Sequence, residues 1–121
     1  MIEGGIAMQV LHTDQKSVEV DGDGYLVNSD DWNENIAQTL ASREGIKELD
    51  ANGINMLKFI RWYYRTFDFF PIINAICKNV HEAKDCVNER FINPLVAWKL
   101  AGLPHPEEPI VSLLQAGQSP G

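Results

Sequence analysis

The stretch from Asp50 to Phe67 constrains the fold of this chain more than any other. Four of its residues recur at three- or four-residue spacing and therefore share one face of a helix: Leu57, Ile60, Tyr64 and Phe67. Asp50 can begin this helix by accepting hydrogen bonds from its first backbone amides, and Gly53 falls in the first turn. We therefore predict a long amphipathic helix whose apolar face the rest of the chain must cover.

A second helix is predicted upstream, from about residue 30 to residue 43. Three consecutive residues can cap its start, Ser29, Asp30 and Asp31, and Glu34 completes a capping box with Asp31. Three apolar residues then follow at four-residue spacing: Trp32, Ile36 and Leu40. Gly45 provides a natural end.

Further helices are predicted downstream of the dipeptide Phe70-Pro71, because the residue before a proline is pushed away from helical geometry. The helix that begins near Pro71 buries Ile73 and Ile76, and with the preceding helix it could form a helix-turn-helix. Two more segments are expected to be helical, 81–90 and 93–100. Beyond Pro104 the chain is rich in proline and reads as an extended arm that passes into a loose tail.

The N-terminal part contains two short segments of alternating character, 9–12 and 17–20, which predict a β-hairpin. Residues 1–8 show no period and are expected to be a disordered terminus. The predicted fold class is therefore α+β and mainly helical, with a small N-terminal β-hairpin, about five helices and an extended C-terminal arm. With 121 residues and 45% hydrophobic content, the chain is expected to form a single domain.

The charge balance favours a protein partner over nucleic acid or an anionic membrane. Ten basic residues stand against 17 acidic ones, so the net charge is −7 and the overall field repels phosphate groups. The two cysteines are too few for a disulfide framework, and we recognise neither a secretory signal nor a membrane span. We therefore expect a cytoplasmic protein.

Several separated motifs, taken in their order and spacing, resemble the DsrC/TusE family of sulfur-relay proteins, which is related to the gamma subunit of dissimilatory sulfite reductase. The resemblance covers residues 17–106 and rests on Asp23-Gly24-Tyr25-Leu26, Trp32, Glu44-Gly45-Ile46, Phe59-Ile60-Arg61-Trp62-Tyr63-Tyr64-Arg65-Thr66-Phe67, Pro71 and Ala101-Gly102-Leu103-Pro104. It implies a small, mainly helical domain with an N-terminal hairpin, in agreement with the reading above.

In that family the Ala-Gly-Leu-Pro segment leads to a penultimate cysteine, which carries sulfur as a persulfide or trisulfide on a mobile arm. The corresponding position here is Pro109, and a second cysteine found in some members corresponds to Trp98. Asn74 stands where many members have arginine, and the segment between Val80 and Phe91 is shortened. Residues 107–121 form a tail that the resemblance does not cover.

Cys77 and Cys86 are the chain's only thiols. Cys77 lies at the edge of an apolar stripe, as buried structural cysteines commonly do, whereas Cys86 lies in a polar stretch and is expected to be more exposed. Cys86 is therefore the one candidate for an alternative persulfide. The sequence leaves open whether the two cysteines form a disulfide, although a reducing cytoplasm argues against one. No catalytic residues, metal site or cofactor site are recognised.

The residues expected to bind a partner fall in two groups. Lys58, Arg61 and Arg65 form a basic stripe on the long helix, with Trp62 beside it, and arginine and tryptophan are common interface anchors. A solvated face paired with acidic residues is the alternative for this stripe. The second group lies along the arm: Leu103, Pro104, His105, Pro106 and Pro109.

The resemblance implies a protein of sulfur metabolism. Because both cysteine positions are replaced and no catalytic residues are recognised, we expect a monomer that is not an enzyme. We expect it to act as an interaction or regulatory partner of a sulfite reductase or a sulfurtransferase complex, without a persulfide on a C-terminal cysteine. Two alternatives remain open. One is a sulfur carrier that uses Cys86, and the other is a DNA-binding transcriptional regulator that uses the helices around Pro71, which the net charge disfavours.

Overall fold

A computed structural model describes residues 9–12, 17–69, 71, 73–83 and 85–115. The expected disordered terminus at 1–8 and the end of the tail at 116–121 lie outside these ranges. The elements, in chain order, are β1 (Gln9–His12), β2 (Ser17–Val20), a 3-10 helix η1 (Ser29–Asp31), α1 (Glu34–Arg43), α2 (Ala51–Phe67), α3 (Ile73–Asn79), α4 (Cys86–Phe91), α5 (Pro94–Leu100) and α6 (Glu108–Gln115). None of the helices in these ranges has both the length and the apolar character needed to cross a bilayer.

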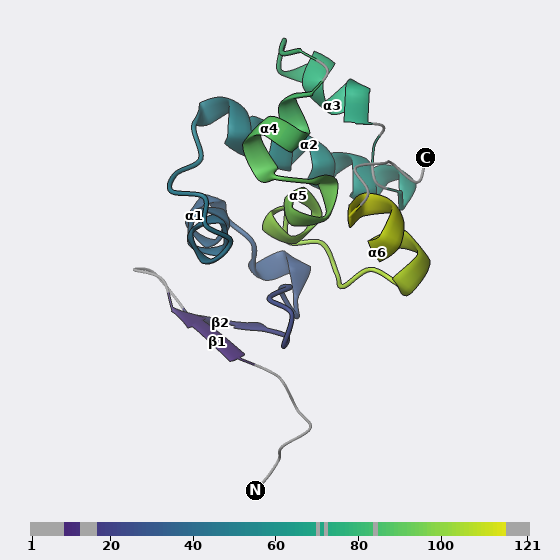
Figure 1. Ribbon diagram of the computed structural model, residues 1–121. Helices are drawn as coiled ribbons and strands as arrows, with labels where there is room; N and C mark the ends of the chain where they lie inside the picture. The colour runs from purple at the N-terminus through teal and green to yellow at the C-terminus, as the bar shows by residue number, and fades with distance from the viewer. Residues whose placement is uncertain (1–8, 13–16, 70, 72, 84, 116–121) are drawn as a thin grey trace, which may run out of the picture.

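The helices gather on one side of the antiparallel hairpin β1–β2, which lies at one end of the molecule (Figure 1). Leu11 pairs with Val18 in the hairpin register, and these residues together with Val20 are buried against the helical part. The predicted fold class, a mainly helical domain with a small N-terminal hairpin, is confirmed.

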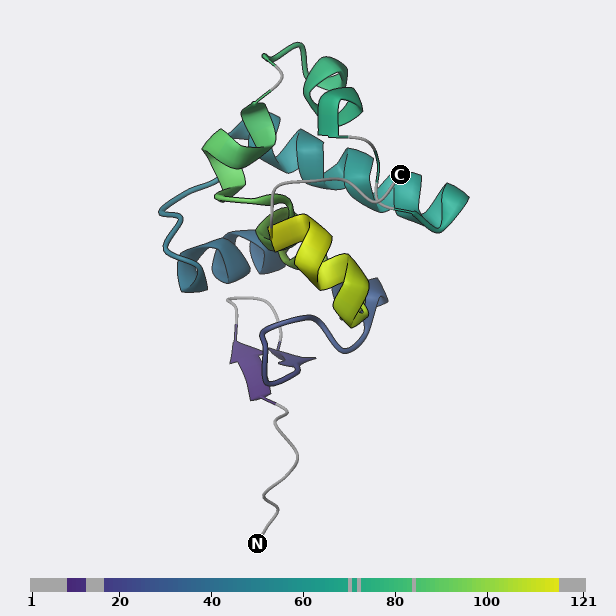
Figure 2. The ribbon, with the colours of Figure 1, turned by 45° about the vertical axis from the view of Figure 1, so that its right-hand side comes forward.

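The helix α5 lies at the centre of the helical part, where it contacts α1, α2, α4 and α6. Its start follows from the sequence: the side chain of Asn93 accepts a hydrogen bond from the backbone amide of Val96 at 3.0 Å, and Pro94 occupies the first turn. Most of its residues are buried, including Trp98 and Leu100. Figure 2 shows α6 in front of α5, with α2 passing above α6 in this view.

The helix α2 begins as predicted, because Asp50 accepts a hydrogen bond from the amide of Gly53 at 2.8 Å. Its buried face is concentrated in its first half, at residues such as Met56, Leu57 and Ile60. Phe67, the last residue of the helix, is 50% exposed, so the core does not cover the predicted face along its whole length. The apolar stripe therefore leaves the core towards the end of the helix.

Two helix boundaries differ from the prediction. The helix α1 begins at Glu34 rather than near residue 30, because the side chain of Asn33 accepts from the amide of Ile36 and Trp32 has extended backbone geometry. The expected capping box between Asp31 and Glu34 is therefore wrong. The helix expected over 81–90 is also shorter, because α4 begins only at Cys86.

The C-terminal segment differs from its prediction more than the two helix boundaries do. The extended arm ends at Glu108, where α6 begins, and α6 packs against α5 in the part of the chain that was expected to be a loose tail. Ile110 lies against the hydrophobic core.

Candidate functional site

The stem that connects α5 to the arm, residues Ala101 to Pro104, requires glycine at its second position. Gly102 has a φ of +74°, in the left-handed region that glycine adopts most readily. A Cβ atom there would come within 2.6 Å of Trp32 Cδ1 and 3.0 Å of Arg61 Nη1. Both the backbone conformation and the lack of space therefore exclude a side chain at this position.

Arg61 attaches this stem to α2. Its guanidinium donates hydrogen bonds to the carbonyl oxygen of Ala101 at 2.9 Å and to the side chain and carbonyl oxygen of Ser29, each at 3.2 Å. The guanidinium carbon lies 4.6 Å from the ring centroid of Trp32, whose indole donates to the carbonyl oxygen of Leu100 at 2.8 Å. Burial lowers the pKa of Arg61 to about 10, so the group stays charged at neutral pH. Arg61 is thus a structural tether for the stem.

The other two members of the basic stripe are engaged in surface ion pairs. Lys58 Nζ lies 2.7 Å from Glu34 Oε2, and Arg65 Nη2 lies 2.7 Å from Asp30 Oδ1. All four side chains are more than half exposed, so each pair contributes little to stability. Lys58 and Arg65 are thus solvated and paired with acidic residues, and a partner-binding role for the stripe stays a prediction.

Trp62, which lies beside the stripe, is also exposed, at 56%. It belongs to an aromatic cluster on the outer face of α2, formed by Phe59, Trp62, Tyr63 and Phe67. Ring centroids within the cluster are 4.7 Å apart for Tyr63 and Phe67 and 5.9 Å apart for Phe59 and Trp62. Sequence reasoning missed this cluster, although the spacing of residues 59, 62, 63 and 67 already places them on one helix face.

The arm is folded back along the domain. Trp98 donates its indole N–H to the carbonyl oxygen of Pro104 at 2.6 Å. Leu103 and Pro106 are buried, whereas Pro104 and His105 are exposed. Pro109 lies in the first turn of α6. Of the arm residues predicted to bind a partner, Pro104 and His105 are thus accessible, while Leu103 and Pro106 anchor the arm.

His105 connects the arm to the turn after the hairpin. Its Nε2 lies 2.8 Å from Asp23 Oδ2, and its ring centroid lies 4.4 Å from that of Tyr25. The hydrogen bond to the Asp23 carboxylate raises the pKa of His105 above its ordinary value. The motif Asp23-Gly24-Tyr25-Leu26 and the arm, which are far apart in the sequence, thus meet at this residue.

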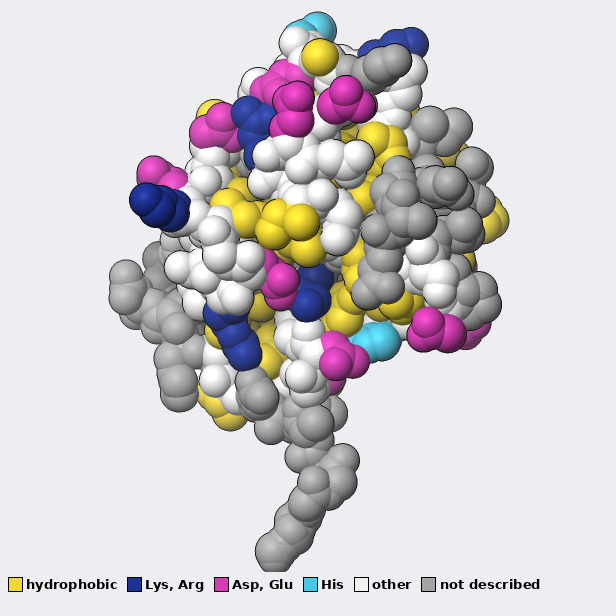
Figure 3. Space-filling model, in the orientation of Figure 1, with side chains coloured by type: hydrophobic (Ala, Val, Ile, Leu, Met, Phe, Trp, Pro, Cys, Tyr) yellow, Lys and Arg dark blue, Asp and Glu magenta, His cyan; other side chains and the backbone are white. Residues whose placement is uncertain are grey.

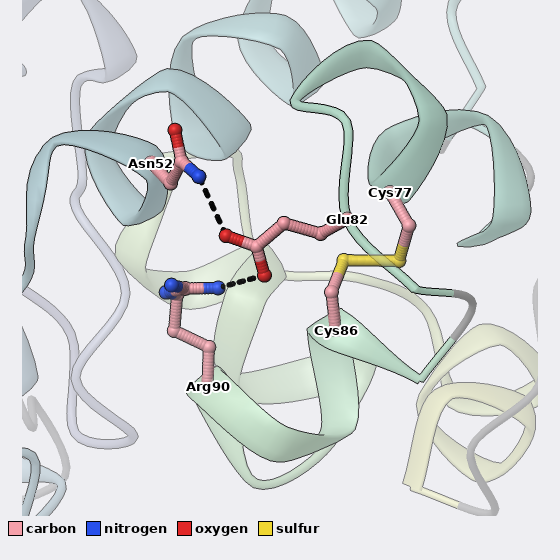
Figure 4. Close-up of a disulfide and its surroundings, with 5 residues drawn as sticks. All are labelled: Asn52, Cys77, Glu82, Cys86 and Arg90. Carbon is pink, nitrogen blue, oxygen red and sulfur yellow. Dashed lines mark hydrogen bonds and ion pairs between the residues drawn. A yellow bond between two sulfur atoms is a disulfide. The ribbon is translucent and has the colours of Figure 1, made fainter.

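Cys77 and Cys86 form a disulfide that joins the end of α3 to the start of α4, with their Cα atoms 5.7 Å apart (Figure 4). Cys77 is 0% and Cys86 is 1% exposed. The expectation that Cys86 is more exposed is wrong, because Cys86 lies on the same side of α4 as the buried residues Val87 and Phe91. As the structure stands, Cys86 has no thiol with which to take up sulfur.

A polar network lies beside the disulfide and fastens the same segment to α2 (Figure 4). Glu82 accepts hydrogen bonds from Asn52 at 2.6 Å and from Arg90 at 2.7 Å. Arg90 also makes a double contact with Asp50, at 2.8 and 3.0 Å. The hydrogen bonds from Arg90 lower the pKa of Asp50 and of Glu82. Sequence reasoning missed this network, because only the tertiary fold brings these residues together.

The comparisons with known proteins agree with this geometry. The family described as DsrC like protein matches residues 12–110. A sulfurtransferase TusE homolog of Haemophilus influenzae is 35% identical over 106 residues, which are 80% of this chain and 96% of that protein. The crystal structure of dissimilatory sulfite reductase I (DsrI) has a TM-score of 0.72 and 30% identity, and the match covers 83% of this chain and 98% of that one. The oxidized gamma subunit of the dissimilatory sulfite reductase (DsrC) from Archaeoglobus fulgidus, at 24% identity and a TM-score of 0.69, has the same fold.

One prediction about activity is overturned by these relatives. We expected a protein that is not an enzyme, but the curated relatives are named sulfurtransferases. The error came from treating the two replaced cysteine positions, Trp98 and Pro109, as evidence against any role in transfer. The family match over residues 12–110 and the close agreement in fold show that this chain belongs to the DsrC/TusE family of sulfur-relay proteins.

Proposed function

We propose that this chain takes part in sulfur transfer as an interaction or regulatory partner that docks onto a sulfite reductase or a sulfurtransferase complex through its arm. The surface that makes contact consists of Pro104 and His105 together with the exposed Trp62. Residues 103–121 contain no cysteine, so in this proposal that part of the arm carries no persulfide. A cytoplasmic location is part of this proposal.

The observation that carries the proposal is the way in which the stem is held. Arg61, Trp32 and Trp98 fix the backbone of residues 100–104 with three hydrogen bonds of 2.6 to 2.9 Å. This leaves Pro104 and His105 exposed at a defined place beside α2. A preorganised segment loses less conformational entropy when a partner binds it, so it is well suited to docking.

Site-specific photocrosslinking in cells tests the docking role. A photoreactive amino acid is placed at position 105 and, as a matched control, at position 48, where Glu48 is exposed in the loop between α1 and α2. We expect position 105 to yield a crosslink to a sulfite reductase or sulfurtransferase subunit that position 48 does not yield. Equal yields, no product from position 105, or products only with proteins outside sulfur metabolism would contradict the proposal.

A second candidate function is sulfur carriage by the cysteine pair. The disulfide supports it, because a persulfide formed on Cys86 could be resolved by Cys77 at bonding distance. It requires prior reduction and local opening, because both side chains are buried. After reduction and incubation with a persulfide donor, intact-mass analysis should then show one added sulfur atom in Cys77→Ser, where no second thiol can expel it as sulfide, and none in Cys86→Ser. No added sulfur in Cys77→Ser excludes this candidate.

A cytoplasmic location is compatible with the disulfide only if the bond is protected from reduction. Cytosolic thiol systems keep accessible cysteines reduced, so a disulfide persists there only while it is protected from exchange. The near-complete burial of Cys77 and Cys86 supplies such protection. The reduced thiols expected from the sequence are not what the structure shows.

A further inference from the structure

A cavity of about 460 Å³ lies between the end of α2, α5, the arm and α6. Its described lining residues are Tyr64, Asp68, Phe69, Trp98, His105, Glu107 and Ile110. This volume is within the range of sites that take small ligands or single side chains. All of these lining residues lie within residues 12–110, the part of the chain that the family model matches.

Aromatic rings form the walls of this cavity. Tyr64 and Trp98 meet edge to face, with ring centroids 5.4 Å apart and an interplanar angle of 72°. Phe69, at 62% exposure, stands at the rim. The negative faces of such rings attract cations, and a planar guanidinium can also stack on them.

Two carboxylates give the cavity its charge. Asp68 and Glu107 both line it, and among the described residues neither has an ion-pair partner. Burial raises the pKa of Tyr64 most, and the negative charge of Asp68 raises it further. The carboxylate of Asp68 therefore acts on the Tyr64 side of the cavity. On the face shown in Figure 3, hydrophobic side chains lie exposed among acidic ones, in keeping with a net charge of −7.

Among the described residues, the cationic side chains near the cavity are already paired or hydrogen-bonded. His105 is bound to Asp23, Arg65 is paired with Asp30, and Arg61 is held by Ser29 and Ala101. The last two line a neighbouring hollow that shares Tyr64 and Asp68 with this cavity. The unpaired charge inside the cavity is therefore negative.

We propose that this cavity binds an arginine side chain presented by the partner protein, with the guanidinium against the rings of Tyr64 and Trp98 and paired with Asp68 or Glu107. Arginine fits better than lysine, because its planar group stacks on aromatic rings and forms paired hydrogen bonds with a carboxylate. This inference rests on the proposed docking function, since His105 lines the cavity and lies in the docking segment.

A pair of model peptides tests the inference without the partner. The probes are acetyl-Gly-Arg-Gly-amide and its citrulline counterpart, which has nearly the same shape but no charge. The readout is the NMR signal of the Trp98 indole N–H, assigned with Trp98→Phe. We expect a saturable shift with the arginine peptide and about tenfold weaker binding of the citrulline peptide, because the cation–π contact and the charge-assisted hydrogen bond are lost.

Matched variants locate the site. Asp68→Asn with Glu107→Gln should weaken binding of the arginine peptide, whereas Glu48→Gln with Asp85→Asn, which changes the net charge equally at exposed positions, should not. No shift, equal binding of both peptides, or equal weakening in both double variants would overturn the inference. Such a failure leaves the crosslinking result untouched. Crosslinks only to proteins outside sulfur metabolism would overturn the proposed function while leaving arginine binding in place.

Discussion

The indole of Trp98 donates a hydrogen bond of 2.6 Å to the carbonyl oxygen of Pro104, and this contact closes the stem of the arm back onto α5. Trp98 thus holds the stem of the arm in place.

Trp98→Phe should keep the aromatic packing and lose this hydrogen bond. Because Trp98 is only 5% exposed, we expect the free energy of unfolding to fall by about 1 kcal/mol. Urea denaturation measures this change. Trp62→Phe, at an exposed position, is the control and should change it by less than about 0.5 kcal/mol. Equal effects of both substitutions would contradict the role assigned to the bond.

Gly102→Ala and Gly45→Ala separate crowding from backbone strain. Both glycines have positive φ, at +74° and +87°, but an added Cβ meets Trp32 Cδ1 at 2.6 Å only at Gly102 and meets nothing within 4 Å at Gly45. We expect Gly45→Ala to cost about 1 kcal/mol from strain alone and Gly102→Ala about 3 kcal/mol, because overpacking adds to the strain. If the two costs in chemical denaturation are the same, the stem is not crowded in solution.

Replacing both Cys77 and Cys86 by serine should lower the free energy of unfolding by about 2–3 kcal/mol, because the disulfide closes a short loop with a sequence separation of 9. The comparison is made by denaturation of the oxidised wild type and the double variant. Wild type that has been unfolded, reduced and refolded in the presence of a dithiol serves as the control and should match the variant. An unchanged midpoint in both would show that the disulfide contributes no stability.

Arg90→Gln should remove an acid-sensitive part of the stability. Arg90 lowers the pKa values of Asp50 and Glu82 below their ordinary values of 3.8 and 4.5, so its contribution is full above those values and is lost as the pH falls through the lowered ones. The difference in unfolding free energy between wild type and Arg90→Gln should therefore be constant near neutrality and shrink below pH 4.5. For Lys47→Gln, at an exposed position, the difference in unfolding free energy from the wild type should not shrink at low pH.

The contact between His105 and Asp23 predicts the opposite dependence on pH. The pKa of His105 is raised above 6.5 by the Asp23 carboxylate, so the stabilising contact is complete below pH 6.5 and is lost as the pH rises through the raised pKa. NMR titration of the His105 ring should give a pKa above 6.5 in the wild type and a lower one in Asp23→Asn. A titration that this substitution leaves unchanged would rule out the contact in solution.

Features that depend on local spacing were predictable from the sequence. Asp50 at the start of α2 and Asn93 before α5 cap their helices through hydrogen bonds to residues three positions further on. The start of α1 was not predictable, because several neighbouring residues can cap a helix. Asn33 caps the helix directly after Trp32, and the side chain of Trp32 is hydrogen-bonded to the carbonyl oxygen of Leu100, 68 residues away. Such a long-range contact cannot be read from local spacing.

The candidate site was less predictable than the fold. The motif containing Arg61 was identified, but its role as a tether depends on Ser29 and Ala101, which only the tertiary structure brings to it. The pairing of Cys77 with Cys86 depends on the angle between α3 and α4, which sequence spacing does not determine. The residues after Pro109 were expected to form a loose tail, because the contact between α6 and α5 depends on tertiary packing, which local spacing does not reveal.

Because the disulfide is buried, the rate at which it is reduced reports how often the native state opens locally. Thiol–disulfide exchange requires a thiolate to reach a sulfur atom, and the side chains of Cys77 and Cys86 are 0% and 1% exposed. Under native conditions, reduction must therefore wait for α3 and α4 to separate transiently. When such openings close again faster than the reductant attacks, the reduction rate follows the population of the open state. That rate then gives the free energy of local opening at this corner of the molecule, separately from the global unfolding transition.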